Sequence, residues 1–412
     1  MPLPATLNVS LDFSTGATFG IPFTLDDVKN GILGTNVLAD QASFIADLTS
    51  DTIRISTRRG RNVLRDTYEA GYCTVRVQDP NSYFSPQNTA SPYYGQLQPL
   101  RKLRISATYS GTNYFLFSGY VSEYRYTYPT NQDTGFVDIT AFDAFRLFQL
   151  ANVTTITNGT VGQDTGTRIG KILDMVSFPT SMRTLDTGNS LTIADPATQR
   201  TSLVALKNAE TAEQGAFYVN AAGTVVFKNR TNTIGSGSGT PIAFNQTTGI
   251  PYGDLKFAFD DKLIINQATV TRSGGSAQTA SNATSIAQYF PHSISMTDSV
   301  IDTDANALNI AQIYVATRQA TTIRIDEMTI DLNNPSVPTG TILGIDYFQN
   351  VTITNVQPDN STITKNLQIQ GIAHDITPNN WKAYFTTLER ITDGFIVGSS
   401  TYGVLGQDII AF

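Results

Sequence analysis

Apolar and polar residues alternate along most of the chain, and this pattern limits the fold more than any other feature. It recurs in segments such as "LNVSLDF" (7–13), "CTVRVQ" (73–78), "KLRISATY" (102–109) and "FVDITAF" (136–142). A period of two with β-branched and aromatic residues predicts strands with one buried face. Short spacing, with Gly, Pro and Asn between the segments, favours an antiparallel barrel or sandwich over βαβ units. We therefore predict a first, mainly β domain of this kind over residues 1–150.

Residues 151–250 follow a helical period instead. The segment "SLVALKNAETAEQ" (202–214) predicts a helix with Ser202 as its N-cap and Gly215 just after its end. A hairpin follows in "AFYVNAAGTVVF" (216–227), where "NAAG" is the turn and the apolar residues of both strands face the same side. A two-stranded ribbon is marginal by itself and needs a packing partner. We therefore predict a small α+β insert in which the helix covers the hairpin.

Alternation returns after residue 250, in "DLKFAFDD", "TTIRIDEMTIDL" and "WKAYFTTLE". It predicts a second β domain over 251–390, interrupted by one helix over 302–319 that Asp302 or Thr303 caps. The residues of that helix predicted to face inward are Ala307, Leu308, Ala311 and Val315. Residues 391–412 form a C-terminal tail. The predicted fold is mainly β, with two antiparallel β-barrel-like domains that flank an α+β insert.

The composition excludes several function classes. Apolar residues make up 40% of the chain and charged residues 15%, which indicates a folded protein with an uncharged polar surface. With 27 basic and 34 acidic residues, the net charge of −7 opposes binding of nucleic acid through phosphate neutralisation. The single cysteine, Cys73, cannot form an internal disulfide, and its strand pattern predicts a buried, inert thiol. No signal peptide or membrane-spanning run is recognisable, so we expect synthesis and folding in a host cytoplasm.

No motif predicts catalysis, a metal or a cofactor. His292 and His374 lie in separate segments without the orienting partner or ligand spacing that catalytic and metal sites need. Pairs of acidic residues occur at Asp260 with Asp261, Asp302 with Asp304, and Asp326 with Glu327. A glycosidase needs two carboxyl groups that face each other across a cleft at a fixed separation, which a sequence does not show. The "DPNSYFSPQN" loop lacks the EF-hand pattern, and "GSGSG" lacks the lysine of a phosphate-binding loop. We predict that the protein is not an enzyme and carries no cofactor.

One concentration of charge stands out, the arginine cluster in "RISTRRGRNVLR". Its members are Arg54, Arg58, Arg59, Arg61 and Arg65. The cluster is interpreted as a solvated strand and loop, as a subunit interface that pairs with acids of a neighbour, or as a DNA-binding patch. The acidic charge of the whole chain disfavours the last of these.

Several segments together resemble the minor tail proteins of long-tailed phages, the tail-tip or baseplate hub proteins. The first is residues 70–124, whose matching positions are Asn81, Phe84, Pro86, Asn88, Pro92, Tyr94, Gly95, Leu97, Phe117, Gly119 and Val121. The second is the helix and hairpin, with matching positions Leu206, Glu210 or Glu213, Gly215, Gly223, Phe227 and Arg230. Residues 138–151, 260–275 and 371–389 are similar to further family segments.

The resemblance implies a homotrimer in which each subunit gives two similar barrels. Three copies would then imitate a sixfold ring, join the sixfold tail tube to threefold tip components and form the channel for DNA ejection. If each of six barrels gives four strands, about 24 strands at ~4.8 Å spacing close a circle roughly 37 Å across, which leaves about 25 Å inside the side chains. That width admits one DNA duplex, which would pass without specific binding.

The resemblance also implies partners and a location. The partners are the distal tail protein, the tape measure protein, tip fibre or receptor-binding proteins and, indirectly, the host envelope, and the location is the distal end of the virion tail. We expect a subunit interface at the arginine cluster and at Phe117, Gly119 and Val121, and tail docking through Phe395, Tyr402 and Leu405. The alternatives are a receptor- or carbohydrate-binding tip protein, for which Tyr93, Tyr94 and Tyr126 are available, and a sixfold distal tail ring protein.

Overall fold

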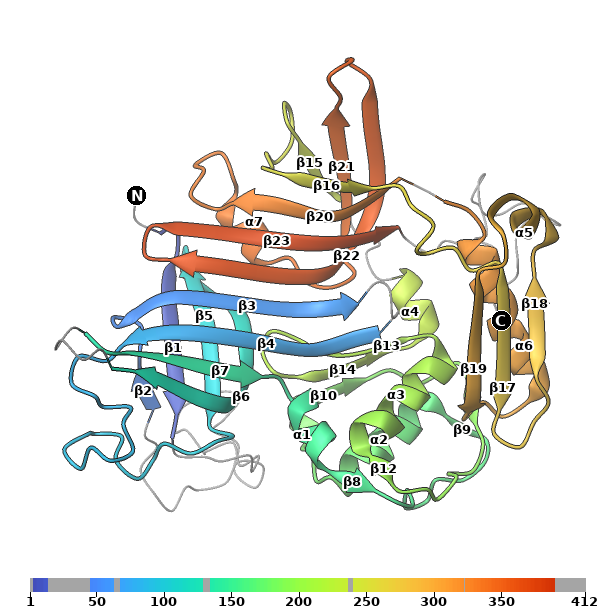
Figure 1. Ribbon diagram of the computed structural model, residues 1–412, viewed down its shortest axis with the longest axis horizontal. Coiled ribbons are helices and arrows are strands. Elements are labelled where there is room, and N and C mark those ends of the chain that lie inside the picture. Colours follow the sequence, from blue (N-terminus) through green and yellow to red (C-terminus); the bar gives the residue numbers. More distant parts are fainter. Residues whose placement is uncertain are drawn as a thin grey trace.

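A computed structural model describes residues 3–13, 45–62, 67–128, 134–235, 240–321 and 323–389. The arginine Arg65 and the tail residues Phe395, Tyr402 and Leu405 lie outside these described residues. A 13-stranded sheet dominates the fold (Figure 1). Its N-terminal strands are β1 (Thr6–Asp12), β2 (Ile45–Asp47), β3 (Thr52–Asn62), β4 (Thr67–Gln78), β5 (Lys102–Tyr109), β6 (Thr112–Thr127) and β7 (Phe136–Phe142). Its C-terminal strands are β15 (Ile242–Asn245), β16 (Leu255–Ala258), β20 (Arg324–Asp331), β21 (Asn350–Val356), β22 (Thr362–Thr377) and β23 (Asn380–Glu389).

The strands from the two ends of the chain form one continuous sheet. Its order is β16-β20-β23-β22-β3-β4-β7-β6-β5-β1-β2. In addition, β21 pairs with the N-terminal part of β22, and β15 pairs with β21. Every pairing is antiparallel except the one between β15 and β21. The prediction of a mainly β, antiparallel fold is confirmed. The described strands, however, leave open edges at β2 and β16 rather than closing two separate barrels.

The two halves of the sheet meet where β3 pairs with β22, at a contact between two glycines. Gly60 lies opposite Gly371, and a Cβ atom built on Gly60 would lie 2.5 Å from the Cα atom of Gly371. Gly60 also has a φ of +149°, which side chains rarely adopt. Register shifts in the β3–β4 and β22–β23 pairings occur at these same glycines. Two glycines therefore allow the backbones to approach closely enough to join the halves.

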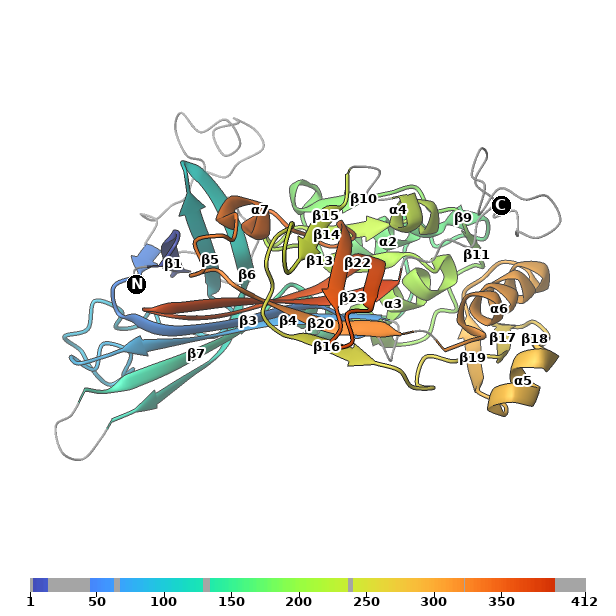
Figure 2. The same cartoon turned by 90° about the horizontal axis from the view of Figure 1, so that it is seen from above.

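One face of the central strands is packed and the other is uncovered. The packed face of β4 carries Cys73, Val75 and Val77, all fully buried, which confirms the prediction of a buried thiol. Trp381 and His374 lie on the same face in the C-terminal half, where the indole Nε1–H donates to His374 Nδ1 at 3.2 Å. The hairpin of β13 (Ala216–Val219) and β14 (Val225–Lys228), with α7 (Thr339–Leu343), lies on this side of the sheet (Figure 2).

A helical unit follows the N-terminal half of the sheet. Its elements are α1 (Phe145–Leu150), β8 (Asn152–Val153), β9 (Gln163–Asp164), α2 (Thr165–Met175), β10 (Arg183–Leu185), β11 (Leu191–Thr192), β12 (Arg200–Thr201), α3 (Ser202–Glu213) and α4 (Arg230–Gly235). The predicted hairpin is confirmed, with Phe217 opposite Phe227. The predicted N-cap is wrong by one residue, since Thr201 and not Ser202 caps the start. At the other end Gln214 is the C-cap and takes the left-handed conformation, and Gly215 follows it at the predicted position.

A second small unit lies at the end of the molecule beyond α3 (Figure 1). It comprises β17 (Gln267–Arg272), β18 (Gln278–Ser281), α5 (Ala283–Tyr289), β19 (Ser293–Ser299) and α6 (Asp304–Arg318), with its own apolar cluster. The predicted helix is confirmed as α6, and the Thr303 hydroxyl caps it by accepting from Asn306 N. The inward residues include Ile310 in place of the predicted Leu308. Within the described residues, no helix is both long enough and apolar enough to cross a bilayer.

Asp143 ties the sheet to the helical unit. Its carboxylate, at the end of β7, accepts hydrogen bonds from Gly71 N of β4 at 2.6 Å and from Phe145 N of α1 at 3.0 Å. Burial raises the pKa of Asp143 to about 7, although these hydrogen bonds and the nearby Lys207 and Arg59 act to lower it. The carboxyl group therefore takes up a proton in the folded protein at a pH at which it is ionised in the unfolded chain.

We expect Gly60→Ala to destabilise the protein by about 2–4 kcal/mol, because the added Cβ would clash with the backbone of β22 and occupy an unfavourable φ. Gly170→Ala is the matched control. Its Cβ would meet only Leu185 Cδ1, at 3.6 Å, and alanine in α2 should be neutral or stabilising by about 0.5–1 kcal/mol. Urea denaturation measures both. Equal stability of the two variants would contradict the importance of the glycine contact.

We expect Asp143→Asn to change how stability depends on pH. A folded pKa near 7 against an unfolded value near 3.8 means that the wild-type protein loses stability as pH rises from about 4 to 7. The asparagine variant should lack this contribution, which is at most about 1.4 kcal/mol per pH unit. The measurement is the free energy of unfolding at several pH values. Asp138→Asn, at an exposed ion pair, is the control, and parallel pH profiles for wild type and Asp143→Asn would contradict the assignment.

Candidate functional site

The uncovered face of the central strands carries many polar side chains. Figure 2 shows no described element over this side of β3, β4, β22 and β23. We call it the open face. Its exposed or half-buried side chains are Arg54, Ser56, Arg58, Tyr72, Thr74, Arg76, Asp138, Thr140, Ala373, Asp375, Lys382, Tyr384 and Thr386. Because β3 pairs with β22, this face continues without a break from one half of the sheet to the other.

A row of charged side chains crosses the open face perpendicular to the strands. The register places Lys382 opposite Asp375, Arg54 opposite Arg76, and Asp138 opposite both Arg76 and Arg125. We call these residues the charge row. It holds four cations and two carboxylates. The row therefore carries a small positive charge in a chain whose net charge is −7.

Carboxylates neutralise most of the cations of the charge row. The guanidinium of Arg54 donates two hydrogen bonds of 3.1 Å to Asp375, and that of Arg76 donates two, of 2.7 and 2.8 Å, to Asp138. Arg125 binds Glu123 on its own strand at 2.8 Å. The hydrogen bonds that Arg76 donates to Asp138 also raise the pKa of the Arg76 guanidinium. Exposed pairs of this kind contribute only about 0–1 kcal/mol each, so their main effect is on the surface charge and not on stability.

The structure separates the members of the predicted arginine cluster. Arg54 and Arg58 point to the open face, whereas Arg59 points to the packed face. The side chain of Arg59 is 9% exposed, donates to Asp346 Oδ1 at 2.7 Å and lies 4.7 Å from the ring centre of Tyr347. Arg61, beyond the register shift, lines a cavity at the end of β3. Strand alternation predicts that Arg58 and Arg59 point to opposite faces, but it does not predict the register shift at Gly60.

The other predicted interface residues belong to the interior of this chain. Phe117 is 2% exposed and Val121 is fully buried. A Cβ on Gly119 would lie 2.4 Å from the carbonyl oxygen of Phe142. Strand β6 pairs with β5 over residues 112–120 and with β7 over residues 120–127, so its two halves have different neighbours. The side chains of Phe117 and Val121 are therefore buried within this chain, and an interface role for this part of β6 and for the arginines stays a prediction.

The residues considered for catalysis, His374 and Asp260 among them, bind other side chains of the fold. Burial lowers the pKa of His374 to about 3, so the ring is neutral when it accepts from Trp381. Hydrogen bonds from Arg324 and from Lys262 hold the pKa of the Asp260 carboxyl well below its usual range. Among the described residues, no three His, Cys, Asp or Glu side chains are grouped to hold a metal ion.

The tyrosines considered for sugar binding divide into two groups. Tyr93 packs with its ring centre 5.2 Å from that of Phe13 and 5.1 Å from that of Phe84, so it belongs to the core of the loop. Tyr94 is exposed, and Tyr126 stacks on Tyr128 with ring centres 6.0 Å apart. The structure does not bring the three predicted tyrosines together into one stacking surface.

In the segments that carry the resemblance, several polar side chains make hydrogen bonds to loops of the same chain. In the loop after β4, Asp79 accepts from Tyr83 N and Phe84 N, and Asn88 donates to the carbonyl oxygens of Asn81 and Ser82. In α3, the buried Glu213 accepts hydrogen bonds from Thr165 Oγ1 at 2.7 Å, Ser190 N at 2.8 Å and Arg230 N at 3.2 Å. These acidic and amide side chains hold loops in place.

We expect Arg59→Met to destabilise the protein by about 2 kcal/mol, because it removes a charged hydrogen bond and a ring contact from a buried position. Arg58→Met is the matched control at the neighbouring, exposed position and should change stability by less than about 0.5 kcal/mol. Chemical denaturation compares the two. Equal effects would show that Arg59 does not contribute to the packing of Asp346 and Tyr347.

Comparison with known proteins agrees with this geometry. No family model and no curated protein sequence matches the chain. Among solved structures, the 43 kDa tail protein of prophage MuSo2 from Shewanella oneidensis has a TM-score of 0.52 at 11% identity, over 84% of this chain and 96% of its own. A tail protein from Neisseria meningitidis MC58 has a TM-score of 0.54 at 10% identity, over 84% of this chain and 94% of its own. The chain therefore has the fold of these phage tail proteins, as the resemblance in its sequence implied.

Proposed function

We propose that this protein is a structural component of a phage tail tip, in which several copies assemble with their open faces around a channel for DNA. The observation that carries the proposal is the continuity of the open face across the β3–β22 pairing. A polar sheet face that no described element covers needs solvent or a polar partner in front of it. A water-filled channel supplies both, and the fold shared with phage tail proteins supports this use of the face.

The number of strands supports an assembly of three copies. Eight neighbouring strands, β16-β20-β23-β22-β3-β4-β7-β6, run side by side in each chain, four from each half of the sheet. Three copies would supply about 24 strands, and a ring of that size at ~4.8 Å per strand has room for one duplex. Each copy would contribute two four-stranded units, so that a threefold assembly would present six units to a sixfold tail tube.

The chemistry of the open face suits passage of DNA rather than binding. Affinity for DNA comes mainly from cations that neutralise phosphates. On this face the guanidiniums of Arg54, Arg76 and Arg125 already have carboxylate partners. The remaining surface is mostly hydroxyl-bearing and small side chains, such as Ser56, Thr74 and Thr140. A duplex would therefore meet a weakly charged wall and no base-reading groups.

The edges of the sheet would provide the contacts between copies. In the eight-strand segment these edges are β16, which pairs with β20, and the C-terminal part of β6, which pairs with β7 but not with β5. Unpaired edges favour association with another strand, and ring closure removes them. The remaining partners in this proposal are the distal tail protein, the tape measure protein and tip fibre or receptor-binding proteins. The role is structural, at the distal end of the tail, without catalysis.

The mass of the assembly in solution tests this proposal. We expect multi-angle light scattering to give three copies per particle, alone or after mixing with the distal tail protein. Six copies would favour the distal ring alternative, and a single copy under both conditions would contradict the assembly.

Arg58→Glu in the same measurement separates the two roles of the exposed arginines. If Arg58 lines the channel, the particle mass should stay the same. Loss of the assembly, with an unchanged melting temperature, would place Arg58 at the subunit interface instead. Arg125→Glu, on the same face, is the matched control.

A further inference from the structure

A hollow of about 610 Å³ lies on the open face, at the point where β3 meets β22. Its floor is the backbone of Gly60 and Gly371, which carry no side chains and lie opposite each other in the sheet. The larger side chains around this floor are Arg58, Tyr72, Tyr384 and Thr386. The volume falls within the range of about 300–1,000 Å³ that is typical of ligand sites. The glycine contact that joins the two halves therefore also leaves a recess in the open face.

The register places an arginine and two tyrosines in one line across this hollow. Arg58 lies opposite Tyr72 on one side and opposite Ala373 on the other, and Ala373 lies opposite Tyr384. Because neighbouring strands are ~4.8 Å apart, Arg58 and Tyr384 begin about 10 Å apart, with only the methyl group of Ala373 between them. Neither tyrosine makes a side-chain hydrogen bond or a ring contact within the described part of the chain. Two aromatic rings are therefore available to a flat ligand.

Arg58 is the cation that this hollow offers to such a ligand. Its side chain has no ion pair and no hydrogen bond with any residue that the structure describes. The other cations of the lining are already bound: Lys256 lies 2.5 Å from Glu327, and Arg59 donates to Asp346. An anion that enters the hollow therefore meets an unpaired guanidinium beside exposed rings.

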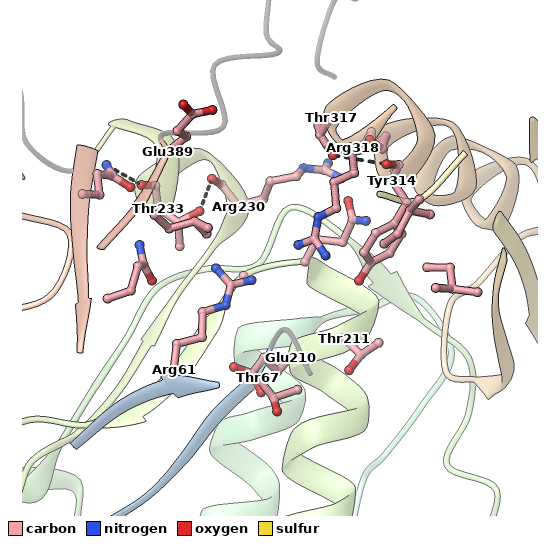
Figure 3. Close-up of a pocket in the computed structure, with 18 of the residues that line it drawn as sticks. Arg61, Thr67, Glu210, Thr211, Arg230, Thr233, Tyr314, Thr317, Arg318 and Glu389 are labelled. Atoms are coloured by element: carbon pink, nitrogen blue, oxygen red, sulfur yellow. Dashed lines mark hydrogen bonds between the residues drawn. The ribbon is translucent and has the colours of Figure 1, made fainter. Parts of the chain in front are cut away.

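A second cavity, of about 360 Å³, differs from the hollow in this respect. It lies between the ends of the central strands, α4 and α6, and Figure 3 shows Arg61, Arg230 and Arg318 beside it. Each of these three arginines already has an interaction partner within the chain. An unpaired guanidinium therefore distinguishes the hollow on the open face from this cavity.

We propose that the hollow holds an unpaired nucleotide of a single-stranded DNA end. This inference rests on the proposed function, in which the open face lines a channel for DNA. A phosphate would bind the guanidinium of Arg58, which suits the geometry of phosphate oxygens. The base would lie over Ala373 with one side against the ring of Tyr384, and Tyr72 would contact the next base, since bases stack on aromatic side chains whatever their sequence.

The chemistry of the hollow favours a single strand over other occupants. In a duplex the bases stack on one another, so that only phosphates would reach the wall and both tyrosines would stay without a contact. An acidic peptide with an aromatic side chain offers similar groups, but the channel places DNA in front of this face. One free cation in the described lining implies weak binding of one phosphate, which allows the strand to move on.

Fluorescence anisotropy of the full chain with three labelled DNA probes tests the proposal. The probes are an oligothymidine of about ten nucleotides, an abasic strand with the same number of phosphates, and a blunt duplex of about 20 base pairs. We expect the oligothymidine to bind with a dissociation constant of about 0.1–1 mM and the other two probes to bind at least about fivefold more weakly. A rise in salt from about 50 to 200 mM should weaken binding of the oligothymidine only about two- to threefold, as one phosphate contact requires.

Substitutions in the hollow assign the binding to these side chains. Arg58→Gln should weaken binding of the oligothymidine about fivefold and remove most of its salt dependence. Tyr384→Leu should lower the affinity for the oligothymidine to that for the abasic strand, and Ala373→Leu, which fills the space between Tyr384 and Arg58, should do the same. Arg125→Gln removes the same charge from the same face and, as the matched control, should change each affinity less than about twofold. Thermal melting and light scattering check that each variant keeps its fold and its number of copies.

Several outcomes would overturn the proposal. These are equal affinity for the oligothymidine and the abasic strand, tighter binding of the duplex, or an effect of Arg125→Gln as large as that of Arg58→Gln. Binding of an acetyl-Glu-Phe-amide peptide without binding of the oligothymidine would assign the hollow to an acidic peptide instead. Any of these results from a particle of three copies would remove this inference and leave the proposed channel in place, whereas a single copy per particle would contradict the proposed function itself.

Discussion

The pairing of β3 with β22 is the interaction on which the architecture depends, because it joins strands from the two ends of the chain into one sheet. Strands that come from segments more than 300 residues apart meet here through Gly60 and Gly371. A side chain at Gly60 would push the two backbones apart, because its Cβ atom would clash with the backbone of Gly371. The halves would then have separate faces, and the open face would lose its continuity. The same pairing aligns the packed faces, so that the β13–β14 hairpin and the segment after α7 cover a single surface.

Several acidic side chains of this chain connect elements of the fold through hydrogen bonds. Glu213 connects α2, α3 and α4 through hydrogen bonds to loops, and Asp143 connects two strands to the start of α1. Asp79 holds the long loop after β4 in the same way. A carboxylate that accepts several backbone N–H groups replaces the hydrogen bonds that a loop would otherwise make with water. This explains why acidic residues recur in the segments that carry the family resemblance.

Local pattern predicted what depends on neighbouring residues in the sequence. Alternation identified the strands and the buried position of Cys73, and a helix-and-hairpin pattern identified α3 with β13 and β14. It did not predict which strands pair, because pairing of β3 with β22 depends on contacts between distant segments. The resemblance names positions and not their neighbours, so it did not predict that the side chains of Phe117 and Val121 are buried. A cavity that distant segments line could not be predicted for the same reason.

Strand alternation decides how the arginine cluster is used. Arg58 points to the open face, and Arg59 points to the packed face, where Asp346 and Tyr347 surround it. Arg61 lies two residues after Arg59 and opposite the buried Tyr68, so it lies on the packed side as well. A single basic segment therefore supplies both a wall of the proposed channel and cations inside the fold. A cation inside the fold requires an acceptor, which Asp346 provides for Arg59.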